Sequence, residues 1–183
     1  MKTNRIPIKE LAHLPGRAAF TVSRARDQVG YYSNHTGRWE LYAMSLKDLS
    51  SRQLTHGEAP RALTAGLAWG RDDRTLYYAR DENGNEHNNL FAASLDEGTV
   101  RQLNQDPDTQ DYVWDTFDDK ISVLASSTRN GQVNLFRYYP GDSQWIQLTH
   151  FANPVQVGII SPGGHQIAFR PTSPTIWPTS TAI

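Results

Sequence analysis

The sequence contains no cysteine, no block of like charge and no long apolar run. The lack of cysteine excludes disulfides, thiolate metal ligands and a cysteine nucleophile. Lysine and arginine number 18 against 19 aspartate and glutamate residues, so the charge pattern of a nucleic-acid-binding or anionic-membrane-binding protein is missing. No stretch approaches the roughly 20 apolar residues of a membrane span. The first residues lack a secretion signal, and we therefore expect a cytoplasmic protein.

What the sequence does contain is a repeated phrase. "RQLTH" at 52–56, "RQLN" at 101–104 and "IQLTH" at 146–150 place leucine at intervals of 49 and 45 residues. A second phrase, written "ELYAMSL", "NLFAASL" and "NLFRYYP", keeps the same two intervals. Further landmarks with similar spacing precede turns rich in aspartate or glycine: Trp69, Trp114 and Ile160. The sequence therefore predicts a structural unit that repeats about every 46 residues.

Each unit has the pattern of four short β-strands separated by turn-forming residues. In the second copy, β-branched, aromatic and leucine residues predict strands at Leu63–Trp69, Thr75–Arg80, Asn89–Ala93 and Thr99–Leu103. Asn-Gly pairs at 83–84 and 130–131 are strong hairpin signals. Four antiparallel strands repeated in this way are typical of a β-propeller, whose blades are small twisted sheets packed face to face around a channel.

The propeller interpretation assigns a packing role to the repeated letters. The middle strands, "LYYA", "SVLA" and "QIAF", are apolar almost continuously, which predicts burial against neighbouring blades on both faces. The leucine of the repeated phrase should point into the blade interface from the outermost strand. Arg52 and Gln53 should face solvent and protect that edge from foreign strands.

Three segments are expected along the chain. Residues 1–16 form a lead-in with a short helix at Ile8–Leu14. Residues 17–170 form a partial β-propeller, an all-β fold with three four-stranded blades and the first strands of a fourth. Residues 171–183 form an irregular tail, because the proline residues deny it a central strand: Pro171, Pro174 and Pro178.

The stretch from Arg17 to Phe169 resembles the propeller of acylaminoacyl-peptidase-like members of the prolyl oligopeptidase family, through "GYYSNHTGRWELYAMSL" and "YYARDENGNEHNNLFAASL". More distantly it is similar to the WD40-like repeats of TolB. The resemblance implies a domain that cleaves no bond, covers a following α/β-hydrolase domain and admits only short peptides. Gly163 stands where the family's Ser-Pro-Asp-Gly turn has aspartate. The blade count also falls short of the roughly seven that the resemblance implies, which indicates a truncated or frame-shifted fragment.

Motifs for chemistry are weak. A serine hydrolase of this family needs a Gly-x-Ser-x-Gly elbow, which the sequence lacks, and Ser161 is interpreted as a turn hydroxyl. The six histidines do not cluster at metal-ligand spacing, and His56 and His150 should be solvated loop residues. "DENGNE" at 81–86 begins like a calcium loop but lacks its glycine and final glutamate. We therefore expect no catalytic residue, no cofactor and no metal in this chain.

One connection singles out two residues. The span from Leu54 to Trp69 is the longest crossing between successive units, and such loops lie on a propeller face. Glu58 and Arg61 are therefore candidate contacts at the channel mouth or with the missing hydrolase, where arginine suits a peptide carboxylate. The alternative is a surface salt bridge.

Two functions remain open at this stage. The first is a propeller segment that covers and gates the hydrolase domain of a serine peptidase. The second is a TolB-like module that binds another protein through its channel face. The expected partners are the hydrolase domain or the remaining blades, short peptides, and a second copy of the chain joined through open blade edges; nucleic acid and membrane are not among them.

Overall fold

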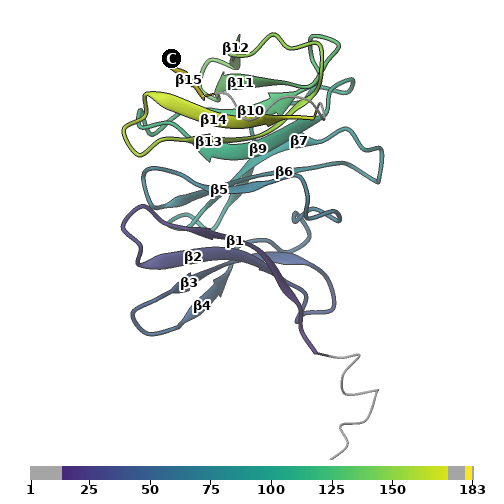
Figure 1. Cartoon of the computed structure of the whole chain (residues 1–183). Coiled ribbons are helices and arrows are strands. Elements are labelled where there is room, and N and C mark those ends of the chain that lie inside the picture. The colour runs from purple at the N-terminus through teal and green to yellow at the C-terminus, as the bar shows by residue number, and fades with distance from the viewer. Residues whose placement is uncertain (1–13, 173–179, 183) are drawn as a thin grey trace, which may run out of the picture.

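The computed structural model describes residues 14–172 and 180–182, and every regular element within them is a β-strand. The strands form four antiparallel sheets in chain order, which we call blades 1 to 4. Figure 1 shows these sheets stacked along the chain, with blade 1 at the bottom of the view and blades 3 and 4 at the top. Across the described ranges, no helix has the length and apolar character needed to cross a membrane.

Blades 1 and 2 each have four strands in meander order. Blade 1 consists of β1 (Arg17–Val22), β2 (Gln28–Ser33), β3 (Glu40–Ser45) and β4 (Ser51–Gln53). Blade 2 consists of β5 (Leu67–Trp69), β6 (Thr75–Arg80), β7 (Asn89–Ser94) and β8 (Val100–Gln102). The four strands predicted for this unit are confirmed, although the first and last are shorter than predicted.

Blade 3 repeats the pattern and blade 4 is incomplete. Blade 3 consists of β9 (Asp111–Thr116), β10 (Val123–Ser127), β11 (Asn134–Tyr139) and β12 (Gln144–Gln147). Blade 4 consists of β13 (Val155–Ile160), β14 (Gln166–Pro171) and β15 (Ser180–Ala182), and β15 pairs with β14. The predicted all-β partial propeller is therefore confirmed. β15 adds a third strand within the segment predicted to be irregular, and most of that segment lies outside the described residues, as does most of the predicted helix at Ile8–Leu14.

The first strand of each blade is the inner strand. β1 contacts β5, β5 contacts β9 and β9 contacts β13, so these strands lie side by side along the inside of the arc. The chain enters each blade at its inner strand and leaves from its outer strand. We call the end with the turns at 23–27, 70–74, 117–121 and 161–165 the turn face. The opposite end, with the connections at 54–66, 103–110 and 148–154, is the crossing face.

The predicted burial on both sheet faces is confirmed for the middle strands of blades 2 and 3, which each have a neighbouring blade on both sides. In β6, Leu76 and Tyr78 pack in the cluster shared with blade 1, whereas Tyr77 and Ala79 pack in the cluster shared with blade 3. β14 differs, because its burial alternates strictly along the strand. Ile167 and Phe169 pack against blade 3, but the other face of "QIAF" is exposed, and the prediction of two-sided burial is wrong there. Blade 4 has no following blade within the described residues to cover that face.

The repeated phrase closes each four-stranded blade in the same way. Leu54 and Leu103 are buried, and Leu148 is half-buried against the core between blades 3 and 4. Each of these leucines donates its N–H to the carbonyl of a leucine in the third strand, at 2.8 Å in all three blades: Leu41, Leu90 and Leu135. The predicted interior position of the phrase leucine is confirmed.

The polar letters of the phrase are also structural. The residue after the leucine accepts a hydrogen bond from the N–H of the third-strand leucine, at 2.8, 2.7 and 2.9 Å in Thr55, Asn104 and Thr149. The glutamine before the leucine donates to the carbonyl two residues further on, at 2.7, 3.0 and 2.8 Å from Gln53, Gln102 and Gln147. Arg52 is exposed, as predicted, whereas Gln53, which was also predicted to face solvent, is half-buried.

Replacing Thr55 by valine should destabilise blade 1 measurably. The Thr55 hydroxyl donates to the buried Glu40 carboxylate at 2.6 Å and accepts the N–H of Leu41. Valine keeps the shape but leaves the Leu41 N–H without this acceptor and removes one of the donors to the Glu40 carboxylate, which keeps Arg38 and the Gly57 N–H; the loss is about 2–3 kcal/mol in free energy of unfolding. Chemical denaturation of the variant measures this loss. Thr99→Val is the matched control, because Thr99 bonds an exposed carboxylate in a surface turn; equal losses would contradict the assigned role of Thr55.

Candidate functional site

An ionic cluster joins the blades at the inner edge of the turn face. Arg24, in the first turn of blade 1, donates from its guanidinium to Asp118 of blade 3 at 2.5 Å. The backbone N–H groups of Arg24 and Ala25 donate to the Asp73 carboxylate of blade 2 at 2.5 and 3.1 Å. Blade 1 is thus linked to its neighbour and also to the blade beyond it.

Arg71 extends this cluster to the remaining blades. Its Nε donates to the carbonyl of Thr116 in blade 3 at 2.9 Å, and its guanidinium lies 3.8 Å from Asp115 and 3.6 Å from Asp118. Asp115 in turn accepts the backbone N–H of Ile160 in blade 4 at 2.9 Å. All four blades therefore meet at one set of arginine and aspartate side chains, which we call the mouth cluster: Arg24, Arg71, Asp115 and Asp118.

An open cavity of about 650 Å³ lies beside the mouth cluster. Its charged lining is Arg24, Arg26, Arg71 and Asp115, and its apolar lining is Val22, Leu46, Ile160 and Pro162. A second cavity, of about 230 Å³, lies between the inner strands and shares Val22, Arg24, Arg71 and Asp115 with the first. We call the larger one the mouth cavity and the smaller one the channel cavity.

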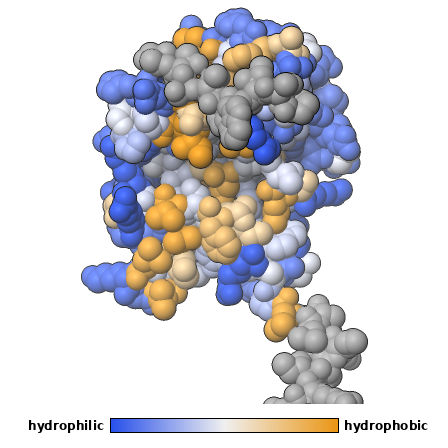
Figure 2. Space-filling model, viewed as in Figure 1, coloured by the Kyte–Doolittle hydropathy of each residue, from blue (hydrophilic) through white to orange (hydrophobic). Residues whose placement is uncertain are grey.

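The inner strands expose apolar side chains toward these cavities. Val22 of β1 and Ile159 of β13 are 52% and 60% exposed, and both line the channel cavity. Figure 2 shows apolar side chains gathered on the viewed side over β1. β-Bulges interrupt the pairing of the inner strand with the second strand in blades 1, 3 and 4, that is, of β1 with β2, β9 with β10 and β13 with β14. Bulges bend a strand and redirect its side chains, and they are over-represented near functional sites.

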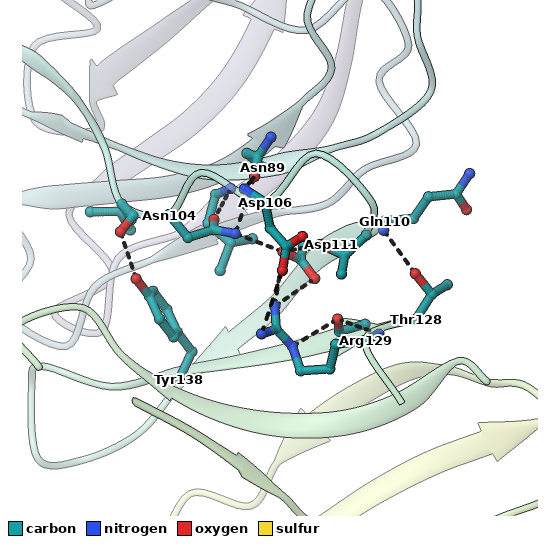
Figure 3. Close-up of polar contacts among 12 residues, drawn as sticks. Asn89, Asn104, Asp106, Gln110, Asp111, Thr128, Arg129 and Tyr138 are labelled. Atoms are coloured by element: carbon teal, nitrogen blue, oxygen red, sulfur yellow. Dashed lines mark hydrogen bonds and ion pairs between the residues drawn. The ribbon is translucent and has the colours of Figure 1, made fainter. Parts of the chain in front are cut away.

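Two buried carboxylates lie near the crossing face. Glu40 at the start of β3 pairs with Arg38 at 2.8 Å and also accepts the N–H of Gly57 at 3.2 Å. Asp111 at the start of β9 is fully buried. Figure 3 shows Asp111 surrounded by polar groups of blades 2 and 3. With these partners, and with those of Glu40, the two carboxylates hold connections between strands in place.

Asp111 has several partners. Arg129 donates to both of its carboxylate oxygens at 3.3 Å, and Asn104 donates to it at 2.8 Å. Burial raises the pKa of Asp111, while the hydrogen bonds and charge of Arg129 and the hydrogen bond of Asn104 act in the opposite direction. The Arg129 guanidinium lies 3.4 Å from the centre of the Trp145 ring. Arg129 is thus fixed on both sides and serves as the internal counter-ion of Asp111.

The two residues singled out from the sequence lie on the crossing face, opposite the mouth cluster. The Glu58 carboxylate accepts the N–H of His56 at 2.6 Å, and the Glu58 carbonyl accepts the Tyr78 hydroxyl at 3.0 Å. Arg61 is exposed near the hairpin tip at Gly84. Glu58 and Arg61 form no ion pair with one another, and their contact with a hydrolase domain stays a prediction.

The other residues considered from the sequence have local roles. Ser161 accepts the N–H of Gln166 at 3.2 Å within the first turn of blade 4, as expected of a turn hydroxyl. Asn83 and Gly84 both take positive φ at the tip of the "DENGNE" loop, which confirms the hairpin tip. His56 and His150 are exposed. Within 14–172 and 180–182, no three metal-ligating side chains gather at one point.

Sequence reasoning missed the mouth cluster. Arg24 and Asp118 are 94 positions apart and belong to non-adjacent blades. Both lie in turns between the first and second strands, and this shared position in the repeat is the signal that could have brought them together. Their proximity depends on the curvature of the arc, which no residue pattern states.

The fold matches solved propeller structures. TolB from Acinetobacter baumannii superposes with a TM-score of 0.74 at 19% identity, over 92% of this chain and 41% of that one. A puromycin-hydrolyzing peptidase from Mycobacterium tuberculosis gives 0.64 at 16% identity, over 85% of this chain and 26% of that one. Oligogalacturonate lyase from Vibrio parahaemolyticus superposes with a TM-score of 0.63 at 14% identity, over 84% of this chain and 45% of that one.

These similarities establish the fold class. The chain is a β-propeller segment of the type found in TolB and in puromycin-hydrolyzing peptidases. It spans less than half the length of that TolB and about a quarter of that peptidase. No family model and no curated protein matches the sequence.

Proposed function

We propose that this chain is a non-catalytic propeller segment that covers and gates the α/β-hydrolase domain of an acylaminoacyl-peptidase-like serine peptidase. The observation that carries the proposal is the four-blade arc, which superposes on a puromycin-hydrolyzing peptidase of which it spans 26%. The family phrases in blades 1 and 2 support the same assignment. On this proposal the chain is a truncated part of a longer protein.

The chemistry of the turns is consistent with a role in access rather than cleavage. The 183 residues contain no Gly-x-Ser-x-Gly elbow, and Ser161 is engaged in its own turn. A cavity of about 230 Å³ lies between the inner strands and an open one of about 650 Å³ lies at the turns beside them, and both suit passage or binding of a short peptide.

The decisive experiment starts with the coding DNA that follows Ile183. A hydrolase domain encoded there is expressed with and without this segment, and hydrolysis is measured on acylated peptides of increasing length. We expect the segment alone to be inactive and its presence to exclude the longer peptides. Length selectivity that is the same with and without the segment, or the absence of a hydrolase in every reading frame, would refute the proposal.

A TolB-like interaction module is the second candidate. The higher TM-score to TolB, 0.74, favours it. Such a module would bind a folded protein through the channel side, with no hydrolase attached. If no hydrolase is encoded downstream and the chain co-purifies stoichiometrically with one folded partner, this candidate replaces the first.

A further inference from the structure

We propose that the mouth cavity binds the carboxyl-terminal residue of a short peptide whose last side chain is apolar. This inference deepens the proposed function, because it rests on peptides being the molecules that the segment admits. It names the part of the peptide that is recognised and the residues that recognise it.

Although Asp118 and Asp115 offset the charges of Arg24 and Arg71, the guanidinium of Arg26 makes the cavity favourable for an anion. Three guanidinium groups and one carboxylate line it: Arg24, Arg26, Arg71 and Asp115. Arg26 makes no ion pair within the described ranges, and the Arg24 side chain is 50% exposed although it bonds Asp118. Arginine presents a planar fork of donors that matches a carboxylate. A peptide carboxylate can therefore pair with Arg26 and the free side of Arg24.

The apolar lining favours a hydrophobic last residue. Val22 and Leu46 are large apolar side chains that remain 52% and 43% exposed, and both line the mouth cavity. The channel cavity continues inward from Val22 and adds Trp114 and Ile159 to the apolar wall. An apolar side chain placed there removes these surfaces from water while its own carboxylate stays at the arginine groups. A volume of about 650 Å³ holds a ligand of dipeptide size.

The mouth cluster gives this site a rigid frame. Arg71 is only 16% exposed, is bonded to the Thr116 carbonyl and lies beside Asp115 and Asp118, so it holds the turns behind the cavity in place. The turn that carries Arg24 and Arg26 is held by the bonds from Arg24 and Ala25 to Asp73. Because the frame exists before the peptide arrives, little ordering is required for binding.

Calorimetric titration of the full chain with acetyl-alanyl-leucine tests the proposal. The free-carboxylate peptide is compared with the same peptide as its carboxamide, and with acetyl-alanyl-glycine. We expect the carboxylate form to bind about tenfold more tightly than the amide, because a charge-assisted bidentate bond is lost. The leucine peptide should also bind more tightly than the glycine peptide.

Two pairs of variants locate the site. Leu46→Glu places a negative charge in the wall and should abolish the preference for the carboxylate, whereas Leu49→Glu changes a neighbouring exposed leucine outside the lining and should leave it unchanged. Arg26→Gln should weaken carboxylate binding about fivefold. Arg74→Gln is its control, because Arg74 pairs with Asp96 away from the cavity. Circular dichroism verifies that all four variants are folded.

Equal affinity for the acid and the amide would overturn the proposal, as would no binding at millimolar peptide to folded chain. Equal effects of Leu46→Glu and Leu49→Glu would overturn it as well. These results are separate from the hydrolase experiment. Peptide binding can fail while the segment still controls length selectivity, and it can succeed when no hydrolase is encoded downstream.

Discussion

Gly66→Ala is expected to lower the free energy of unfolding by about 3–5 kcal/mol. Gly66 lies just before β5 and has a φ of +90°. A β-carbon added there would lie 1.7 Å from the carbonyl oxygen of Val113 in β9. That oxygen belongs to the backbone of the neighbouring inner strand, and Val113 also donates its N–H to the Ala65 carbonyl at 3.0 Å. The clash can be relieved only by separating blades 2 and 3.

Gly37→Ala is the matched control for this prediction. Gly37 has nearly the same φ, +92°, but no atom lies within 4 Å of the added β-carbon. Its cost should be limited to the left-handed backbone, about 1–2 kcal/mol. Urea denaturation of both variants measures the difference. Similar losses at the two positions would show that the contact between Gly66 and Val113 does not govern the packing of these blades.

Arg129→Met is expected to destabilise the protein by about 3–5 kcal/mol at pH 7. Methionine retains an apolar side chain next to Trp145 but removes the positive charge that faces Asp111. The carboxylate is then buried without its counter-ion. Arg74→Met is the control for loss of an exposed ion pair, because Arg74 and Asp96 are both more than half exposed, and its effect on stability should be much smaller than that of Arg129→Met.

The loss of stability in Arg129→Met should depend on pH, because it arises from the charge of Asp111. Burial raises the folded-state pKa of Asp111, so the folded protein binds this proton more tightly than the unfolded chain. The contribution of Asp111 to stability therefore falls as the pH rises from its unfolded-state pKa through its higher folded-state pKa. Removing Arg129 raises the pKa further. The loss in the variant should therefore be largest at neutral pH and smaller near pH 4, where a protonated Asp111 needs no counter-ion. An equal loss at both pH values would contradict this account.

A second-site variant separates charge from packing. Asp111→Asn introduced into Arg129→Met removes the unpaired carboxylate while keeping its size. The double variant should be more stable than Arg129→Met at pH 7. If it is less stable, the loss comes from the contact of Arg129 with Trp145 and not from the ion pair.

The strand pattern was predictable because each blade repeats the same burial and turn requirements. The boundaries of β6 were predicted in full as Thr75–Arg80, and the phrase leucines lie in equivalent places. Residue spacing did not identify equivalent positions where an inner strand contains a bulge. Trp69 pairs with Leu76, but Trp114 falls in the bulge of β9 and is not its equivalent. A bulge adds a residue without changing the composition of a strand, and spacing alone does not reveal it.

The candidate site was less predictable than the fold. The prediction singled out Glu58 and Arg61 because their loop is long, and it placed no weight on the turns that carry Arg24, Arg71 and Asp118. Those turns are short and rich in charged residues, which on their own indicate only solvent exposure. Likewise, no role was predicted from the sequence for the residues that follow the phrase leucine, Thr55, Asn104 and Thr149. Their hydrogen bonds depend on the start of the third strand lying opposite, a relation set by register and not by composition.

The bonds from the repeated phrase to the third strand join residues only 13 to 15 positions apart. A blade can therefore be completed as soon as its own residues leave the ribosome, without waiting for the ring to close. A chain interrupted between blades leaves finished sheets. One interrupted just before the phrase leaves the N–H of the third-strand leucine without its partner, and in blade 1 leaves Glu40 with Arg38 but without the Thr55 hydroxyl. The junctions between blades are accordingly the places where such a protein can be shortened, lengthened or duplicated during evolution.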